Sequence, residues 1–203
     1  MIGLIIKDLI NLKKLSKIYL LILLFYFIVS MAGGNQDMFG GMIVMLAVMI
    51  PITALSYDEK NKWDRYALTM PLMRGTIVLS KYILGLIFLI AASTLAFITN
   101  IIFTEIILYE NLMINLTTFS VGIIMISFIL PIILKFGVEK GRILMMIVIF
   151  TPVAIIVMLP KLGIPAPEQE TIEMFLKYLP IAAIITYVLS ILVSVSIYKK
   201  KEF

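Results

Sequence analysis

Six long apolar stretches alternate with short polar connections along this 203-residue chain. The stretches comprise residues 18–32, 38–55, 77–103, 112–134, 143–159 and 180–197. About 20 apolar residues in a helix cross the hydrocarbon core of a bilayer. Because backbone polar groups inside a bilayer must bond to one another, each stretch is predicted to be helical. The pattern therefore predicts an all-α, polytopic membrane protein with six transmembrane helices.

The basic residues lie almost entirely on one side of these predicted helices. Four Lys precede the first stretch, five Lys and Arg lie between or just beside the second and third, three follow the fourth, and three follow the sixth. The opposite side holds only Lys161 and Lys177, whereas the 12 Asp and Glu divide equally between the sides. Cytoplasmic loops retain Lys and Arg, so both termini are predicted to be cytoplasmic. This topology accounts for the net charge of +5, and we expect no nucleic-acid partner.

The composition excludes several classes of function. Hydrophobic residues make up 62% of the chain, and six helices with short loops leave no room for a soluble catalytic domain. We therefore expect one domain over residues 1–203. The chain has no Cys and no His, which removes thiolate metal sites and the commonest general base, and it has no P-loop motif. No catalytic, metal-binding or cofactor-binding residue is expected, and the chain is predicted not to be an enzyme.

Residues 1–17 carry an amphipathic helical pattern. The apolar and polar positions repeat at helical spacing, with Ile2, Ile5, Ile6, Leu9 and Leu12 on one face and Lys7, Asn11 and Lys14 on the other. Such a helix is typical of the membrane interface, where Lys7, Lys13 and Lys14 would face the headgroups. The alternative is an extension of the first span with snorkelling lysines. Residues 30–32 are similar to a signal-peptide cleavage site, but the five stretches that follow favour an uncleaved helix.

The connection between the second and third stretches predicts a short helix over residues 58–70. Asp58 is a plausible N-cap, and Pro71 ends the pattern. The apolar positions recur at i, i+3, i+4 and i+7, namely Trp63, Tyr66, Ala67 and Met70. This face could rest on the membrane, since Trp and Tyr prefer the interface, or fill a groove on a cytoplasmic partner.

The connection over residues 161–178 is predicted to be extracellular. Its prolines prevent a long helix, although residues 168–178 could form a short one. Glu168, Glu170 and Glu173 could attract a cationic ligand or form a solvated acidic face.

No charged residue stands well inside any predicted span. Ion-coupled carriers place such residues at mid-membrane, because an ion must be bound and released there. The pattern therefore argues against an ion-driven carrier, and uphill transport would need another energy source. The predicted cytoplasmic helix over 58–70 is where a soluble motor could act.

At this connection the sequence resembles the ABC-2-type transporter permeases. In that family an acidic pair precedes a Trp, an L-P-x-x-R turn follows, and K-Y opens the next span. The corresponding residues here are Asp58-Glu59, Trp63, Met70-Pro71-Leu72-Met73-Arg74 and Lys81-Tyr82, with Met70 at the Leu position. Within the family the chain is similar to the small membrane subunits of the phenol-soluble-modulin (Pmt-type) exporters of Gram-positive bacteria.

The resemblance implies a permease dimer, of identical or related chains, on cytoplasmic ABC ATPase subunits that bind ATP and Mg²⁺. The helix over 58–70 would be the coupling helix, contacting the ATPase through Asp58, Glu59, Lys62, Trp63, Arg65, Tyr66 and Met70. Residues 1–17 would be an interfacial elbow, and 161–178 an external lid.

The resulting hypothesis is an ATP-driven exporter subunit in a bacterial cell membrane. Met and Phe are frequent, with 14 and 12 residues, and flexible apolar side chains suit an amphipathic substrate such as a cytolytic or antimicrobial peptide. The alternative is a non-transporting membrane scaffold or assembly subunit that binds partners through the same loop.

Overall fold

The computed structural model describes residues 1–33, 36–103, 108–158 and 169–201. Within these ranges the chain forms eight α-helices and no strand, which confirms the all-helical prediction. The helices are α1 (Ile2–Lys13), α2 (Ser16–Gly33), α3 (Gln36–Lys60), α4 (Trp63–Thr69), α5 (Arg74–Phe103), α6 (Leu108–Phe136), α7 (Val138–Met158) and α8 (Gln169–Lys200).

Five of the described helices are long and apolar enough to cross a bilayer: α2, α3 from Met38, α5, α6, and α8 from Met174. They correspond to five of the six apolar stretches. The remaining stretch, 143–159, falls largely within α7, which has 21 residues but is not one of the five. A sixth span in α7 therefore stays a prediction.

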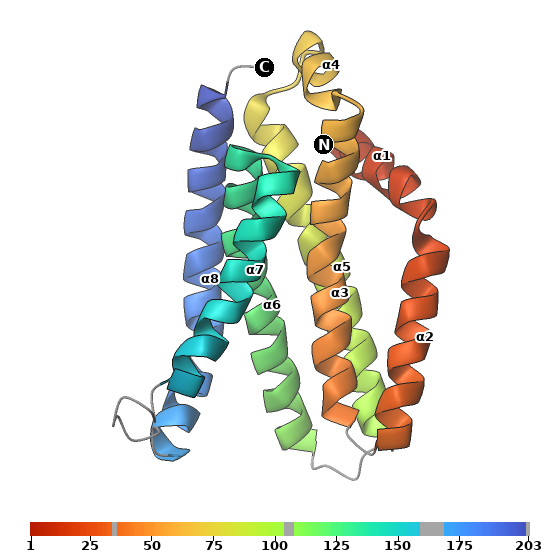
Figure 1. Cartoon of the computed structure of the whole chain (residues 1–203), viewed down its shortest axis with the longest axis vertical. Helices are drawn as coiled ribbons and strands as arrows, with labels where there is room; N and C mark the ends of the chain where they lie inside the picture. Colours follow the sequence, from red (N-terminus) through yellow and green to blue (C-terminus); the bar gives the residue numbers. More distant parts are fainter. Residues whose placement is uncertain (34–35, 104–107, 159–168, 202–203) are drawn as a thin grey trace.

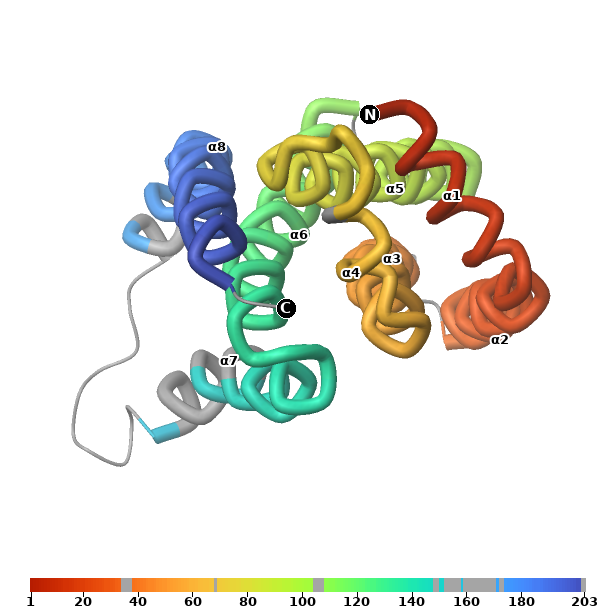
Figure 2. Tube along the Cα trace, turned by 90° about the horizontal axis from the view of Figure 1, so that it is seen from above, coloured from red at the N-terminus to blue at the C-terminus, as the bar shows by residue number. Residues whose placement is uncertain are grey.

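The long helices run side by side, with both chain termini at the end of the bundle that also carries α4 (Figure 1). Viewed along the bundle, α2 lies at one edge and α7 and α8 at the other, with α3, α5 and α6 between them (Figure 2). The most extensive packing joins α6 to α8 and α3 to α5. The core lies where α3, α5 and α6 meet.

A glycine on α6 allows the central helices to approach one another closely. A Cβ at Gly122 would lie 2.6 Å from Cδ2 of Leu89 on α5 and 2.8 Å from Cγ1 of Val44 on α3. Contacts this short do not occur between real side chains, so the crossing of three helices depends on the absence of a side chain here. Small residues commonly serve this role in membrane helix packing.

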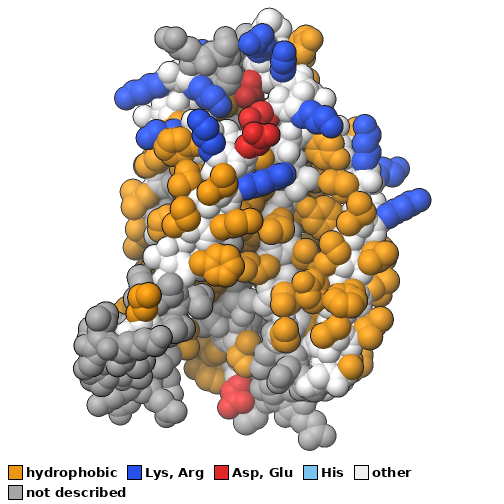
Figure 3. All heavy atoms as spheres, viewed as in Figure 1, with side chains coloured by type: hydrophobic (Ala, Val, Ile, Leu, Met, Phe, Trp, Pro, Cys, Tyr) orange, Lys and Arg blue, Asp and Glu red, His pale blue; other side chains and the backbone are white. Residues whose placement is uncertain are grey.

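Charged and apolar side chains divide along the bundle. Lys and Arg gather at the end that carries the termini, and hydrophobic side chains cover most of the rest of the described surface in this view (Figure 3). Many large apolar side chains are more than half exposed along α2, α5 and α8, for example Leu21, Ile102 and Leu192. An apolar exterior of this kind suits lipid rather than water.

The start of the last helix differs from the sequence-based prediction. The described part of the predicted connection 161–178 is the start of α8, which continues from Gln169 through Pro180 to Lys200. It is therefore not a separate short helix. Residues 159–168, including Glu168, lie outside the described residues. Glu170 and Glu173 belong to α8, but their side chains are not described.

Candidate functional site

The connection between α3 and α5 forms a short helix that projects from the basic end of the bundle (Figure 1). α3 continues through Lys60, and a turn at Lys62 with φ 52° leads into α4 at Trp63. α4 ends at Thr69 because Met70 is extended before Pro71, as expected for a residue that precedes proline.

The predicted start of this helix at Asp58 is wrong. Asp58 belongs to α3, its residue is 4% exposed, and Lys62 occupies the N-cap position of α4 without a side-chain cap. The N-cap prediction rested on local pattern alone. The structure uses Asp58 in a tertiary ion pair instead, which removes its side chain from the surface.

The predicted apolar anchors of α4 point in different directions. Ala67 is fully buried, and Trp63 is partly buried against the core. Tyr66 and Met70 are 62% and 45% exposed, and Met73, just after the helix, is 80% exposed. The outward apolar surface is therefore Tyr66, Met70 and Met73, which we name the tip patch. Lys62 and Arg65 are also exposed.

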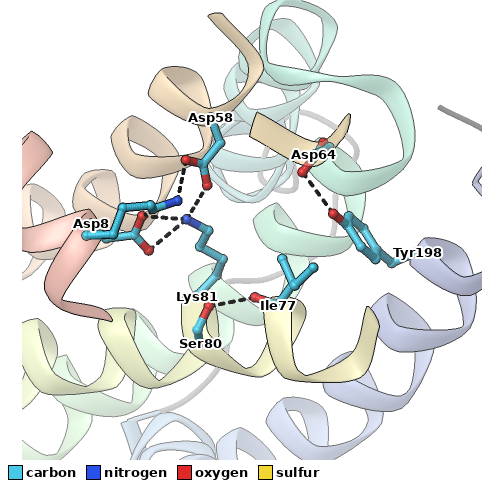
Figure 4. Close-up of polar contacts among 8 residues, drawn as sticks. Asp8, Asp58, Asp64, Ile77, Ser80, Lys81 and Tyr198 are labelled. Carbon is cyan, nitrogen blue, oxygen red and sulfur yellow. Dashed lines mark hydrogen bonds and ion pairs between the residues drawn. The ribbon is translucent and has the colours of Figure 1, made fainter. Parts of the chain in front are cut away.

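Close to the α3–α4 connection, a buried lysine joins three helices through two carboxylates (Figure 4). Lys81 Nζ on α5 lies 2.7 and 2.8 Å from the carboxylate oxygens of Asp8 on α1 and 2.5 Å from Oδ2 of Asp58 on α3. Lys81 and Asp8 are 2% and 1% exposed. A buried charge of this kind requires a partner, so these contacts fix α1, α3 and α5 relative to one another.

Lys7 completes this network and connects it to α4. Its Nζ lies 2.6 Å from Oδ1 of Asp58, 3.1 Å from Oδ1 of Asp8, and 4.4 Å from the centre of the Trp63 ring. Two lysines thus balance two aspartates. The cation over the indole face adds a favourable contact between α1 and α4.

The three lysines predicted for the interfacial helix differ in their exposure, as the apolar residues of α4 do. The side chain of Lys7 is only 21% exposed and belongs to the buried network. Lys13 and Lys14 are exposed. The buried face of α1 consists of Leu4, Asp8 and Leu12.

Glu59 links the end of α3 to the start of α7. Its Oε2 accepts the backbone N–H of Val138 at 2.7 Å. The preceding residue, Gly137, has φ +84°, and a Cβ there would lie 3.1 Å from Oε1 of Glu59. Glycine is thus needed at Gly137 for its backbone conformation and for the approach of the carboxylate. The carboxylate also suits the positive end of the α7 dipole.

Two further contacts join this region to α8. The Tyr198 hydroxyl donates to Oδ1 of Asp64 on α4 at 2.8 Å. Arg74, the first residue of α5, donates from Nη1 to the carbonyl oxygens of Lys199 at 2.6 Å and Lys201 at 3.2 Å. The segment 58–74 therefore has a polar or cation–π contact with each of α1, α5, α7 and α8.

A cavity of about 100 Å³ lies among these contacts. Its polar lining comes from Asp58, Glu59, Asp64, Lys81, Tyr198 and Lys201. A polar cavity of this size admits a few water molecules. The described residues contain no group of three or more His, Cys, Asp or Glu that could hold a metal ion.

A second polar cluster lies deeper in the bundle. The Tyr82 hydroxyl lies 2.5 Å from Oγ of Ser190 and 2.7 Å from Oγ of Ser194. Ser190 donates to the carbonyl oxygen of Ser127, and Tyr187 donates to that of Tyr82. These bonds hold α8 against α5 and α6. Interhelical hydrogen bonds of this kind stabilise membrane bundles by about 0.6–2 kcal/mol each.

Sequence reasoning missed Asp8 and Tyr198, and it assigned Lys81 only to the basic region at the opening of the third span. A weak signal existed for two of them. Asp8 is the single acid in residues 1–17, and Lys81 stands inside an apolar stretch. A charge in such a position is expected to have a partner. The identity of that partner depends on how α1, α3 and α5 pack.

Comparison with known proteins adds a family assignment to this geometry. No curated protein and no solved structure matches the chain. A family model described as ABC-2 family transporter protein matches residues 3–199, which cover all eight helices except the first residue of α1 and the last residue of α8. The chain therefore belongs to the ABC-2 family of transporter proteins.

Proposed function

We propose that this chain is the membrane-spanning permease subunit of an ATP-driven exporter. The family supports an ABC permease whose ATP hydrolysis belongs to a partner chain. The observation that carries the proposal is the tip patch, an exposed apolar surface on α4 and just after it at the basic end. It belongs to segment 58–74, which has polar or cation–π contacts with four other helices. A cytoplasmic ATPase subunit, holding ATP and Mg²⁺, would bind this patch.

The orientation follows from charge. The end that carries α4 and both termini also carries most of the Lys and Arg, so this end faces the cytoplasm. We further propose that α7 is the sixth span and that the protein resides in a bacterial cell membrane.

The tip patch has the character of a docking surface. Tyr66, Met70 and Met73 give it an aromatic and two flexible apolar side chains. Lys62 and Arg65 form an exposed basic rim. Partner interfaces commonly combine an apolar centre with a polar rim. Because Trp63 packs inward against Lys7, its role in this proposal is to hold α4 on the bundle, and it is not expected to enter the ATPase groove.

The contacts of segment 58–74 would transmit a movement of the ATPase to the other helices. Closure of the ATPase would displace α4 as a unit, since the helix has only a turn on each side. Asp58 would carry the displacement to α1 and α5, Glu59 to α7, and Asp64 to α8. Closely packed helices shift relative to one another as rigid bodies rather than bend gradually. A displacement of segment 58–74 would therefore also move the spanning helices.

The substrate class and assembly also belong to this proposal. We propose a dimer with a second permease, identical or related, and an amphipathic substrate such as a cytolytic peptide. The small size and the resemblance to Pmt-type exporter subunits support this class. No charged side chain of the described spans lies in their middle, so the path suits a largely apolar solute.

Co-purification with the ATPase tests the proposal. The wild-type chain, extracted in mild detergent, should retain a stoichiometric ATPase subunit. Replacing Tyr66 and Met73 with Ser should abolish this association while Trp63 fluorescence stays unchanged. Phe136→Ser is the matched control, because Phe136 is an apolar side chain that is 47% exposed at the α6–α7 turn and does not belong to the patch. Retention of the ATPase by the double variant would contradict the proposal.

A non-transporting scaffold is the second candidate, because the same patch could bind a partner without transport. Reconstituted complexes separate the two functions. An exporter hydrolyses ATP faster when its substrate is present, and vesicles accumulate or lose that substrate. A scaffold shows neither effect while still retaining its partner.

A further inference from the structure

Three lysines gather at the corner where α1 meets α2. Lys13 ends α1, Lys14 follows it, and Lys17 lies in the first turn of α2. All three are exposed. The corner has a fixed geometry, because Ser16 Oγ donates to the carbonyl oxygen of Lys13 at 2.8 Å and the Lys14 N–H to that of Asn11 at 3.4 Å. The backbone positions of the three lysines therefore lie close together.

The charge of this corner is not balanced within the described chain. No acidic residue stands between Asp8 and Asp37 in the sequence. Asp8 is buried and already contacts Lys81 and Lys7. None of the corner lysines forms an ion pair among the residues that the structure describes. Three positive charges thus face outward and require counterions.

The surroundings of the corner place it at the edge of the hydrocarbon. α1 exposes a second apolar face, with Ile2, Ile6 and Ile10 at 75%, 50% and 62% exposure. α2 is a candidate span of 18 residues from Ser16, and only 6% of it is buried. In the view along the bundle the corner lies at the periphery (Figure 2). Lipid therefore meets α1 and α2 on both sides of the lysines.

We propose that this corner, defined by Lys13, Lys14 and Lys17, binds the phosphate headgroups of anionic phospholipids. The apolar faces of α1 and α2 would contact the acyl chains, and the ammonium groups would contact the phosphate. Each basic residue near an anionic membrane surface contributes about a fivefold increase in binding, so three contribute on the order of a hundredfold. The inference concerns the surrounding lipid and does not depend on the proposed transport.

The α6–α7 turn shows why this corner is distinguished from other basic positions. That turn also carries three exposed basic residues, Lys135, Lys140 and Arg142. However, Glu139 lies among them in the sequence, and Lys135 Nζ is 5.1 Å from the ring centre of Phe136. Its charge is therefore partly balanced, and it provides a matched control for loss of three positive charges.

Native mass spectrometry of the full chain in detergent tests the proposal. Phosphatidylglycerol and phosphatidylcholine of equal acyl length are added in equal amounts. The wild type should retain phosphatidylglycerol preferentially, and the variant K13Q/K14Q/K17Q should lose most of this preference. The control K135Q/K140Q/R142Q should keep it. Moderate salt should weaken the preference, because exposed charges are screened.

Two results would overturn the inference. One is that the corner shows no effect of its own: either the wild type has no preference for phosphatidylglycerol, or both triple variants lose the preference equally, in which case net charge alone acts. The other is displacement of phosphatidylglycerol by millimolar inorganic phosphate, which would identify a free-anion site rather than a lipid site. Helical circular dichroism of each variant confirms that the comparison is made between folded chains.

Discussion

Lys81 is the side chain whose loss should most perturb the basic end of the bundle. Its ammonium contacts Asp8 and Asp58 at 2.5 to 2.8 Å, and it is 2% exposed. Lys81→Met keeps a long unbranched side chain but removes the charge. Two buried carboxylates then share Lys7 alone, and the local net charge becomes negative.

The magnitude follows from the burial of the pair. Removing one partner of a buried ion pair costs about 3–5 kcal/mol. Lys7 still lies 3.1 Å from Asp8 and 2.6 Å from Asp58, so the lower end, about 3 kcal/mol, is expected. For a chain of this length, that change lowers the unfolding temperature by roughly 6–12 °C.

A second substitution separates charge imbalance from lost packing. Adding Asp8→Asn to Lys81→Met restores neutrality, since Lys7 and Asp58 remain paired. The double variant should recover about 1–3 kcal/mol relative to the sum of the single effects, as expected for residues in direct contact. Lys140→Met, at an exposed lysine, should change stability by less than about 0.5 kcal/mol.

The assay is thermal unfolding in detergent, followed by Trp63 fluorescence. Trp63 is the chain's only Trp, and Lys7 lies over its ring, so its emission reports on this end of the bundle. If Lys81→Met unfolds at the same temperature as Lys140→Met, the buried network does not stabilise the fold. If Asp8→Asn gives no recovery, the carboxylates are not coupled through Lys81.

Two other substitutions probe the packing and the route to α7. Gly122→Ala should lower the unfolding temperature, with a cost of about 1–3 kcal/mol, because the new Cβ would overlap Leu89. Gly41→Ala is the control and should not lower it, because nothing lies within 4 Å of the Cβ there. Equal effects of the two substitutions would refute the close crossing at Gly122. Glu59→Ala removes the acceptor for the α7 N-terminus, so reconstituted complexes should hydrolyse ATP but export less per ATP. Unchanged export per ATP would show that the contact of Glu59 between α3 and α7 does not transmit the movement.

The sequence by itself determined the fold class and the location of five candidate spans. Apolar runs of bilayer length leave the backbone no alternative to helix, and this constraint is local. The asymmetry of Lys and Arg also predicted that both termini are cytoplasmic. This stays a prediction, and the structure adds only that the described Lys and Arg gather at one end of the bundle (Figure 3). The motif around Trp63 and Pro71 indicated the family, which the family model supports.

Only the tertiary structure decided which polar residues act together. Asp58 is a reasonable N-cap in the sequence, yet it bonds to Lys81, 23 residues later, and to Lys7, 51 residues earlier. Trp63 and Tyr66 share one predicted face, yet one packs inward and the other outward. The physical reason is that a charged group or an indole ring is buried only where another helix packs against its position. Helical periodicity in the sequence specifies which residues share one face of a helix. The packing of α1, α3 and α5 specifies which residues that face contacts.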